Sequence, residues 1–211
     1  TLIFREIFAL EEARERSQTV ADRLGPSDFN MPWMNARTDL IAAELLLGNL
    51  SAVERQWASA WDDAQEVQAW EHWLTSGRLA AARAQLELGA GRLDDALTWS
   101  RRALEMAASG GRPKYEAISL QALGQTLTQQ GLAEEAVSEL ERAVTIADRL
   151  GSPLVRWETR AALAVAQRAA LRDEPGDADD RLHGVALDAL DELERRGPEG
   201  LDDRDPRRTR P

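Results

Sequence analysis

The sequence contains no cysteine and only two histidines, His72 and His183. A chain without thiols cannot form disulfides, zinc fingers or iron–sulfur clusters, and it has no thiolate nucleophile. The two histidines have no second metal ligand at a suitable spacing. We therefore expect no metal, no cofactor and no enzymatic activity.

Positive charge is also in deficit, because 26 basic residues face 37 acidic ones and the formal net charge is −11. This balance argues against direct binding of nucleic acid, whose phosphates attract basic surfaces. No apolar run approaches the roughly 18 residues of a membrane span, and no secretory signal is recognisable. A cytoplasmic location is the expectation. The chain opens on Thr1 and an apolar segment, which suggests that it begins inside a longer protein.

β-Branched residues are scarce as well. The chain has 35 Ala and 29 Leu but only 13 Ile and Val together. Alanine and leucine favour helices, whereas isoleucine and valine favour strands. The composition therefore predicts an all-α protein.

What the sequence does contain is an internal repeat with a period of about 42 residues. Residues 86–107 align without gaps on residues 126–147. In both copies a glycine is followed by alanine after five, twelve and sixteen residues. Looser copies are anchored at Gly48 and Asp173. The aligned residues are Gly91, Ala96, Ala103 and Ala107 in one copy and Gly131, Ala136, Ala143 and Ala147 in the other.

Each period predicts two helices joined by a short turn, because apolar residues recur at helical spacing on both sides of the glycine. We expect an α-α superhelix of about nine helices, with one domain over 1–196 and a disordered tail at 197–211. An unpaired helix at 2–24 precedes hairpins at about 33–65, 68–108, 114–150 and 154–196. The predicted helices span 2–24, 33–47, 51–65, 68–89, 92–108, 114–130, 133–150, 154–172 and 178–196.

The third copy has the residue order of a known helical repeat. Its apolar and small residues resemble the tetratricopeptide repeat consensus, although the period exceeds that family's usual length of about 34 residues. The resemblance implies antiparallel helix pairs whose first helices line a concave surface that binds proteins or peptides. The matching residues are Leu120, Leu123, Gly124, Leu127, Gly131, Ala136, Leu140 and Ala143.

Repeats that are this long and this rich in Ala and Arg also look like the C-terminal arms of bacterial multidomain regulators. In those proteins an ATPase module is followed by helical repeats. This second resemblance implies a regulatory or sensor arm of a signalling or transcription regulator. Any attached ATPase or DNA-binding domain would lie outside this chain, since the chain has no phosphate-binding glycine-rich motif.

Glutamine and arginine recur on one face of the predicted first helices, where side chains four residues apart point the same way. Glutamine both donates and accepts hydrogen bonds, and arginine binds carboxylates with two parallel bonds. Together they predict a groove for the backbone or acidic side chains of a peptide. The alternative is that they are ordinary polar residues on a solvent-facing surface. The predicted groove residues are Arg78, Gln85, Gln121, Gln125, Gln129, Arg160 and Gln167.

Seven tryptophans are many for a chain with only three Phe and one Tyr. Trp57 and Trp61 are four residues apart, and Trp70 and Trp73 are three apart, so each pair shares one helix face. An exposed pair would suit a binding hot spot. Filling of the space between the first two hairpins is the interpretation we favour.

The first helix, at 2–24, has apolar residues at helical spacing and fits the second helix of a truncated hairpin. Alternatively, Leu2, Phe4 and Phe8 form a homodimer contact. For the whole chain, three functions follow from the sequence. We expect a protein-interaction module; a small-ligand sensor within a regulator is the alternative, and a helical enzyme with an unrecognised site is the least favoured.

Overall fold

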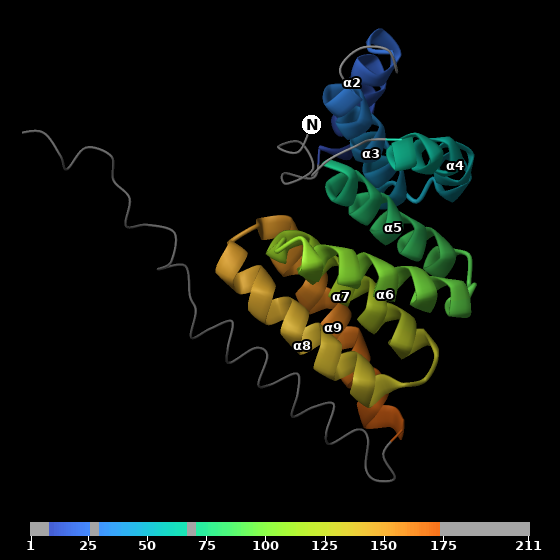
Figure 1. The fold of residues 1–211 in the computed structure, drawn as a ribbon. Helices are drawn as coiled ribbons and strands as arrows, with labels where there is room; N and C mark the ends of the chain where they lie inside the picture. Colours follow the sequence, from blue (N-terminus) through green and yellow to red (C-terminus); the bar gives the residue numbers. More distant parts are fainter. Residues whose placement is uncertain (1–8, 26–29, 67–70, 174–211) are drawn as a thin grey trace, which may run out of the picture. The chain divides into compact units, whose positions relative to one another are not determined.

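The computed structural model describes residues 9–25, 30–66 and 71–173, and within these ranges it contains eight α-helices and no strand (Figure 1). Residues up to Gln167 belong to one unit, and residues from Arg168 onward to a second. None of the described helices has the length and apolar character needed to cross a bilayer. The helices are α2 (Leu10–Arg23), α3 (Asn30–Leu46), α4 (Leu50–Glu66), α5 (Glu71–Gly89), α6 (Leu93–Ser109), α7 (Pro113–Gln129), α8 (Ala133–Leu150) and α9 (Pro153–Asp173).

The predicted all-α class of stacked helix hairpins is confirmed. α3 packs on α4, α5 on α6 and α7 on α8, while α6 also contacts α7 and α2 packs on α3. From α3 to α9, every helix begins and ends within three residues of its predicted bounds. The predicted helix at 178–196, the predicted tail at 197–211 and the first eight residues lie outside the described residues.

The turns inside the first three hairpins share one backbone geometry. Gly48, Gly91 and Gly131 have φ of 76°, 74° and 79°, a conformation that favours glycine. In each turn, the N–H of the residue after the glycine donates to a carbonyl five residues earlier, at 2.9 Å. This repeated bond explains why the glycines mark the period in the sequence. The pairs are Asn49 with Glu44, Arg92 with Glu87, and Leu132 with Leu127.

Gly124 permits close packing of α7 against α8. A β-carbon at this position would overlap the side chain of Leu140, which is fully buried. In the second hairpin, Ala84 and Ser100 occupy the equivalent positions. The second hairpin therefore has small residues at both positions, whereas the third matches a glycine on its first helix to a leucine on its second.

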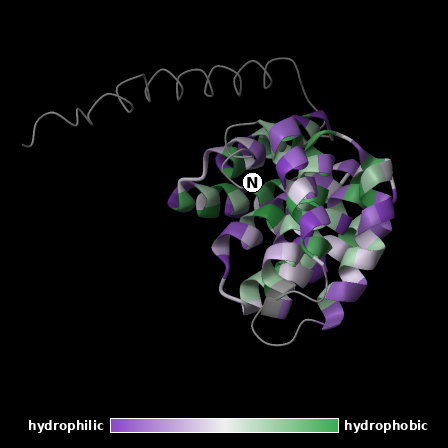
Figure 2. Ribbon diagram, turned by 90° about the horizontal axis from the view of Figure 1, so that it is seen from above, coloured by the Kyte–Doolittle hydropathy of each residue, from purple (hydrophilic) through white to green (hydrophobic). Residues whose placement is uncertain are grey.

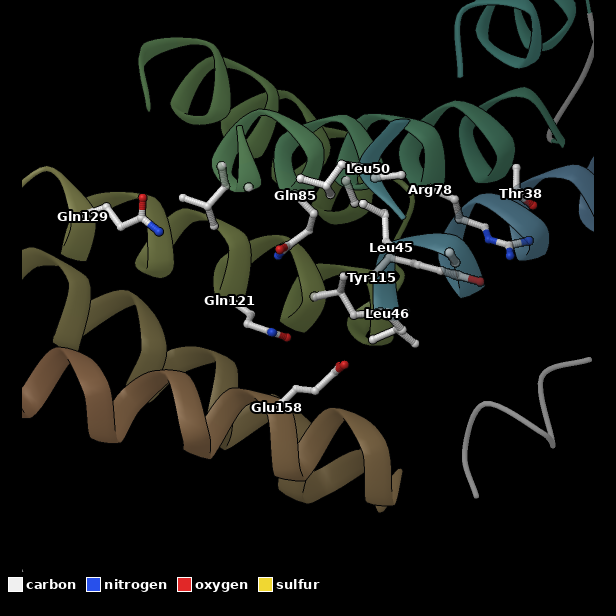
Figure 3. Close-up of a pocket in the computed structure, with 16 residues that line it drawn as sticks. Thr38, Leu45, Leu46, Leu50, Arg78, Gln85, Tyr115, Gln121, Gln129 and Glu158 are labelled. Carbon is white, nitrogen blue, oxygen red and sulfur yellow. The ribbon is translucent and has the colours of Figure 1, made fainter. Parts of the chain in front are cut away.

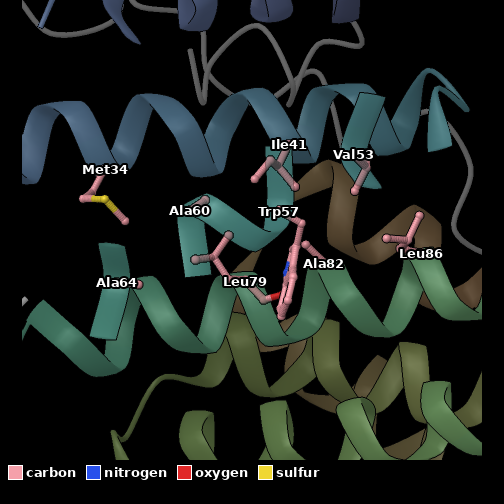
Figure 4. Packing of buried hydrophobic residues seen from close by; sticks show 9 residues of the cluster. All are labelled: Met34, Ile41, Val53, Trp57, Ala60, Ala64, Leu79, Ala82 and Leu86. Atoms are coloured by element: carbon pink, nitrogen blue, oxygen red, sulfur yellow. The ribbon is translucent and has the colours of Figure 1, made fainter. Parts of the chain in front are cut away.

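Apolar side chains collect between neighbouring helices rather than around one centre. One cluster joins α3, α4 and α5 and includes Met34, Ile41, Leu79 and Leu86 (Figure 4). Another joins α7, α8 and α9 around Leu140. In the ribbon coloured by hydropathy, hydrophobic and hydrophilic residues alternate along the helices (Figure 2). Burial of each leucine in this way stabilises the folded state by roughly 1.5–3 kcal/mol.

Three tryptophans pack together where α4 meets α6. The ring centroids of Trp57, Trp61 and Trp99 lie 5.2 Å apart in every pair. Trp57 is buried, and its Nε1 donates to the backbone carbonyl of Leu79 at 2.7 Å. Trp57 and Trp61 therefore fill the space between hairpins, as we favoured from the sequence. The side chains of Trp70 and Trp73 lie outside the described part.

Candidate functional site

A groove runs along the first helices of successive hairpins. It has a volume of about 390 Å³, within the range of known ligand pockets, and is lined by residues of α3, α5, α7 and α9 together with the start of α4 (Figure 3). Its floor is aliphatic. The floor residues are Leu45, Leu46, Leu50, Leu88 and Ile118, with Ala42, Ala81 and Ala82 between them. We call this feature the inner groove.

Polar side chains stand around the aliphatic floor. Four of the seven predicted groove residues line the inner groove: Arg78, Gln85, Gln121 and Gln129. Thr38 on α3, Tyr115 at the start of α7 and Glu158 on α9 complete the polar lining, and none of the three was predicted from the sequence. The structure thus brings together residues from four helices that are far apart in the chain.

Gln125 and Gln85 are joined directly. The Gln85 side-chain nitrogen donates to the Gln125 side-chain oxygen at 3.0 Å. These residues occupy equivalent positions in the second and third repeats, so the recurrence seen in the sequence becomes a contact between neighbouring helices. The bond uses one N–H of Gln85 and one acceptor site of Gln125, so each amide keeps its other donors and acceptors.

Arg78 is held within the protein. Its guanidinium binds the carboxylate of Asp39 on α3, and it also donates to the side-chain oxygen of Asn35 at 3.1 Å. Only about a tenth of each charged side chain is exposed, at 10% for Arg78 and 11% for Asp39. Removing either partner would leave a buried charge uncompensated. Arg78 therefore serves to fix α5 against α3 at the edge of the groove.

Arg160 also has an internal partner, and it lies outside the lining of the inner groove. Its guanidinium donates to both oxygens of Asp148 on α8, at 2.6 and 2.8 Å. Partial burial acts to raise the pKa of Asp148, but the hydrogen bond and the charge of Arg160, aided by Arg156, lower that pKa below its ordinary value. Gln167, further along α9, is half-buried and likewise not part of the lining.

Gln121 is largely enclosed in the groove. Only 8% of the residue is exposed, and no hydrogen bond among the described residues involves its side chain. In Figure 3 its amide extends from α7 towards the space in front of Glu158 on α9. The nitrogen and oxygen of this amide are not among the fully buried side-chain atoms that lack a partner, so the amide still reaches solvent from within the groove. Such a group is suited to binding a molecule that brings its own donor and acceptor.

Sequence reasoning missed the aliphatic floor and the carboxylate of Glu158. A signal for the floor was present in the run of three leucines at 45–47, directly before the turn glycine. Leucine at a helix end is also common in ordinary cores, so the run alone does not indicate a groove. Glu158 gave no signal, since its position depends on how α9 packs beside α7.

A second, more polar hollow lies between α2, α3 and α4. Arg37 crosses it, binding the carboxylate of Asp63 and donating to the hydroxyl of Ser59 at 2.6 Å. Trp33 lies against the same guanidinium, 4.6 Å from its ring centroid. The charges of Arg37 and Asp63 are thus satisfied by each other within this hollow. Nowhere in the described ranges do three or more potential metal ligands come together.

The inner groove and the helix pairs around it can be compared with known proteins. The model of the tetratricopeptide repeat family matches from the middle of α5 to the end of α8. Residues 76–149 match the tetratricopeptide repeat. Tetratricopeptide repeats generally mediate protein–protein interaction, and the matched residues include Arg78, Gln85, Gln121, Gln125 and Gln129.

Among solved structures, the chain is similar to one entitled "Crystal structure of BtubC (BKLC) from P. vanneervenii". The two are 18% identical in sequence with a TM-score of 0.49, and the match covers 82% of this chain and 73% of that one. No curated protein matches the sequence.

Proposed function

We propose that this chain is a protein-interaction module whose inner groove binds a segment of a partner protein. The observation that carries the proposal is the groove itself, where an aliphatic floor is combined with the amide of Gln121, which has no hydrogen bond to the described residues. Gln85, Gln125 and Gln129 extend the row of amides along α5 and α7. A row of amides over an apolar floor can hold the backbone of a peptide while its side chains enter the floor.

Blocking the groove tests this function. Ala42 lies in the groove lining on α3, whereas Ala58 is exposed on α4 outside it. Ala42→Arg places a long charged side chain in the groove, and Ala58→Arg is the matched control. We expect proteins captured by the unaltered chain to be retained by Ala58→Arg and lost with Ala42→Arg, while circular dichroism shows equal helicity. Equal capture by both variants would contradict the proposal.

A small effector molecule is the second candidate, and the volume of about 390 Å³ supports it. A ligand that fills this groove would stabilise the folded chain by mass action. Thermal unfolding in the presence of metabolites and nucleotides tests this candidate. A shift seen with the unaltered chain and absent with Ala42→Arg would favour an effector sensor over a peptide-binding module.

The wider context of the chain is part of the same proposal. We assign it to the cytoplasmic regulatory arm of a bacterial signalling or transcription regulator, with ATPase or DNA-binding domains outside the chain and no catalysis of its own. The support is the Ala- and Arg-rich repeat composition. Reading the coding sequence on both sides of this segment tests the assignment, because a regulator predicts an adjoining ATPase or DNA-binding module.

Self-association through the first helix is a separate proposal. Leu2, Phe4 and Phe8 lie outside the described residues, and only their apolar sequence supports a homodimer contact. Light scattering over a range of protein concentrations tests it. A constant monomer mass would contradict the contact.

A further inference from the structure

We infer that the partner segment lies in the inner groove in an extended conformation and turns only uncharged, aliphatic side chains towards it. This inference rests on the proposed function, and it names the conformation and the chemistry of the partner. It differs from the expectation drawn from the sequence, in which arginines would receive acidic side chains.

The lining has two charged side chains, and both are already engaged within this chain. Arg78 binds Asp39, which lies outside the lining, and Glu158 interacts with another group of the protein. An acidic ligand at Arg78 would have to displace Asp39 or share the guanidinium with that like charge. A basic ligand at Glu158 would compete with an existing interaction. A charged side chain would therefore lose water in the groove without gaining an unoccupied counter-charge.

The uncharged polar groups of the lining differ from the charged ones, because three of them on α7 have no hydrogen bond to the described residues. They are the hydroxyl of Tyr115 and the amides of Gln121 and Gln129. Each amide offers both donors and an acceptor, which matches the N–H and C=O of a peptide backbone. The groups available to a partner are therefore neutral.

The amides on α7 have the spacing of the backbone of an extended chain. Gln121, Gln125 and Gln129 follow one another at intervals of four residues, which is about 6 Å along a helix. An extended chain repeats every two residues, or about 6.6 Å, and presents one N–H and one C=O to the same edge at each repeat. A helical segment would use these groups internally. An extended segment along α7 can therefore meet the three amides with about six residues.

The aliphatic floor fits the side chains of such a segment. Successive side chains of an extended chain point to opposite faces, so every second one can enter the floor while the others stay in solvent. Leu45, Leu46 and Leu50 are half-buried and leave apolar surface that these side chains would cover. In Figure 3 the leucines lie towards the Tyr115 end of the groove, and Gln129 lies at the other end. The bound segment thus carries aliphatic residues at alternate positions.

The test uses libraries of hexapeptides with blocked termini, so that no terminal charge contributes. The alternating library has leucine at every second position and a mixture of Ser, Thr and Asn elsewhere. Two charged libraries replace the central leucine by Glu or by Arg, and a block library places the three leucines in succession. We expect the alternating library to bind the full chain about three- to tenfold more tightly than the others in fluorescence anisotropy. Its affinity should be equal in about 50 and 500 mM NaCl, because no ion pair forms.

N-methylation tests the backbone contacts. Methyl groups on every second peptide nitrogen remove the N–H groups of one edge of an extended chain and leave the other edge intact. Two methylated versions of the alternating library differ only in which edge is blocked. We expect one version to bind about tenfold more weakly and the other to retain its affinity.

Variants of the protein assign the contacts. Gln121→Leu keeps the volume of the side chain but removes its donors and acceptor, so it should weaken binding of the alternating library by about three- to tenfold. Gln167→Leu is the matched control, because Gln167 lies on α9 outside the lining. Ala42→Arg should abolish the binding and Ala58→Arg should preserve it.

Each alternative outcome is decisive. Equal or tighter binding of a charged library, or an affinity that falls with salt, overturns the inference on charge. Equal binding of the block library, equal binding of the two methylated versions, or unchanged binding by Gln121→Leu overturns the inference on the extended backbone. In all these cases, binding that Ala42→Arg abolishes leaves the proposed function standing.

Failure of every library overturns the inference. The proposed function falls as well if protein capture is also insensitive to Ala42→Arg. A dimer that Ala42→Arg converts to a monomer would show that a second copy of the chain occupies the groove, which also overturns the inference.

Discussion

The carboxylate of Glu87 binds the guanidinium of Arg92 across the turn between α5 and α6. Glu87 is almost completely enclosed, with 2% of its side chain exposed, and it is also bound by Arg83 at 2.5 Å. The hydrogen bond from Arg92 to Glu87 raises the pKa of Arg92 above its ordinary value. In the first hairpin Asn49 donates to Glu44 at the same place, whereas the third hairpin has Leu127 and Leu132. The same backbone turn thus has polar side-chain pairs in two hairpins and leucines at both positions in the third.

This relationship predicts that the pair at the second turn can be exchanged for the leucines of the third. Glu87→Leu alone should lower the midpoint of thermal unfolding, because Arg83 and Arg92 lose their shared carboxylate. Glu87→Leu combined with Arg92→Leu should recover most of the loss, since leucine at both positions matches the third turn. A double variant less stable than Glu87→Leu would contradict this expectation.

Gly124→Ala should destabilise the protein by about 1–3 kcal/mol, because the added β-carbon would overlap Leu140. Urea denaturation measures the change in the free energy of unfolding. Gly77, in the middle of α5, is the matched control. A β-carbon there would lie at an ordinary contact distance of 3.7 Å from Met106 Cβ, so Gly77→Ala should stabilise by about 0.5–1 kcal/mol. Equal effects at the two glycines would show that close packing does not select Gly124.

Ser17→Ala should stabilise the protein by about 1 kcal/mol. The Ser17 hydroxyl on α2 is fully buried and has no hydrogen-bond partner among the described residues. Ser100 on α6 is equally buried, but its hydroxyl donates to the carbonyl of Ala96 at 2.7 Å. Ser100→Ala should therefore increase the free energy of unfolding by less than Ser17→Ala in the same denaturation assay. The reverse order would contradict the assignment of Ser17 as an unsatisfied group.

Asp148→Asn should reduce stability at neutral pH by less than about 1 kcal/mol, because its ion pairs are partly exposed to solvent. The pKa of Asp148 is lowered in the folded protein from its ordinary value of 3.8. Its contribution is therefore present above pH 4 or so and disappears as the pH falls through the lowered value. Urea denaturation at pH 7 and near pH 3 checks this. A difference in the free energy of unfolding between the unaltered chain and Asp148→Asn that grows towards acid would contradict the expectation.

The fold was predictable because its determinants are local. Glycine at a left-handed turn and alanine at fixed offsets act within one hairpin, so the positions of Gly91 and Gly131 were enough to place the helices around them. The site depends on contacts between hairpins, which sequence spacing does not reveal. Gln121 could be assigned to a helix face from its spacing alone. The pairing of Arg78 with Asp39 could not, since 39 residues separate them.

Glu158 and Tyr115 illustrate the same limit. Each lies on a helix whose bounds were predicted closely, yet its place in the groove depends on the register between adjacent hairpins. A repeat longer than the usual tetratricopeptide unit gives no fixed rule for that register. The residues predicted on one face of α5 and α7 lie in or beside the groove, while those on α9, Arg160 and Gln167, do not.

The turn glycines also mark positions beside which spin labels can be attached. A β-carbon added at Gly48, Gly91, Gly111 or Gly131 would meet no other atom within 4 Å, so these four corners border open space. Since the chain has no native thiol, cysteines introduced at exposed residues beside two such corners would be the sole attachment points for paired spin labels. Those labels would report the spacing of adjacent hairpins while leaving the aliphatic floor unmodified.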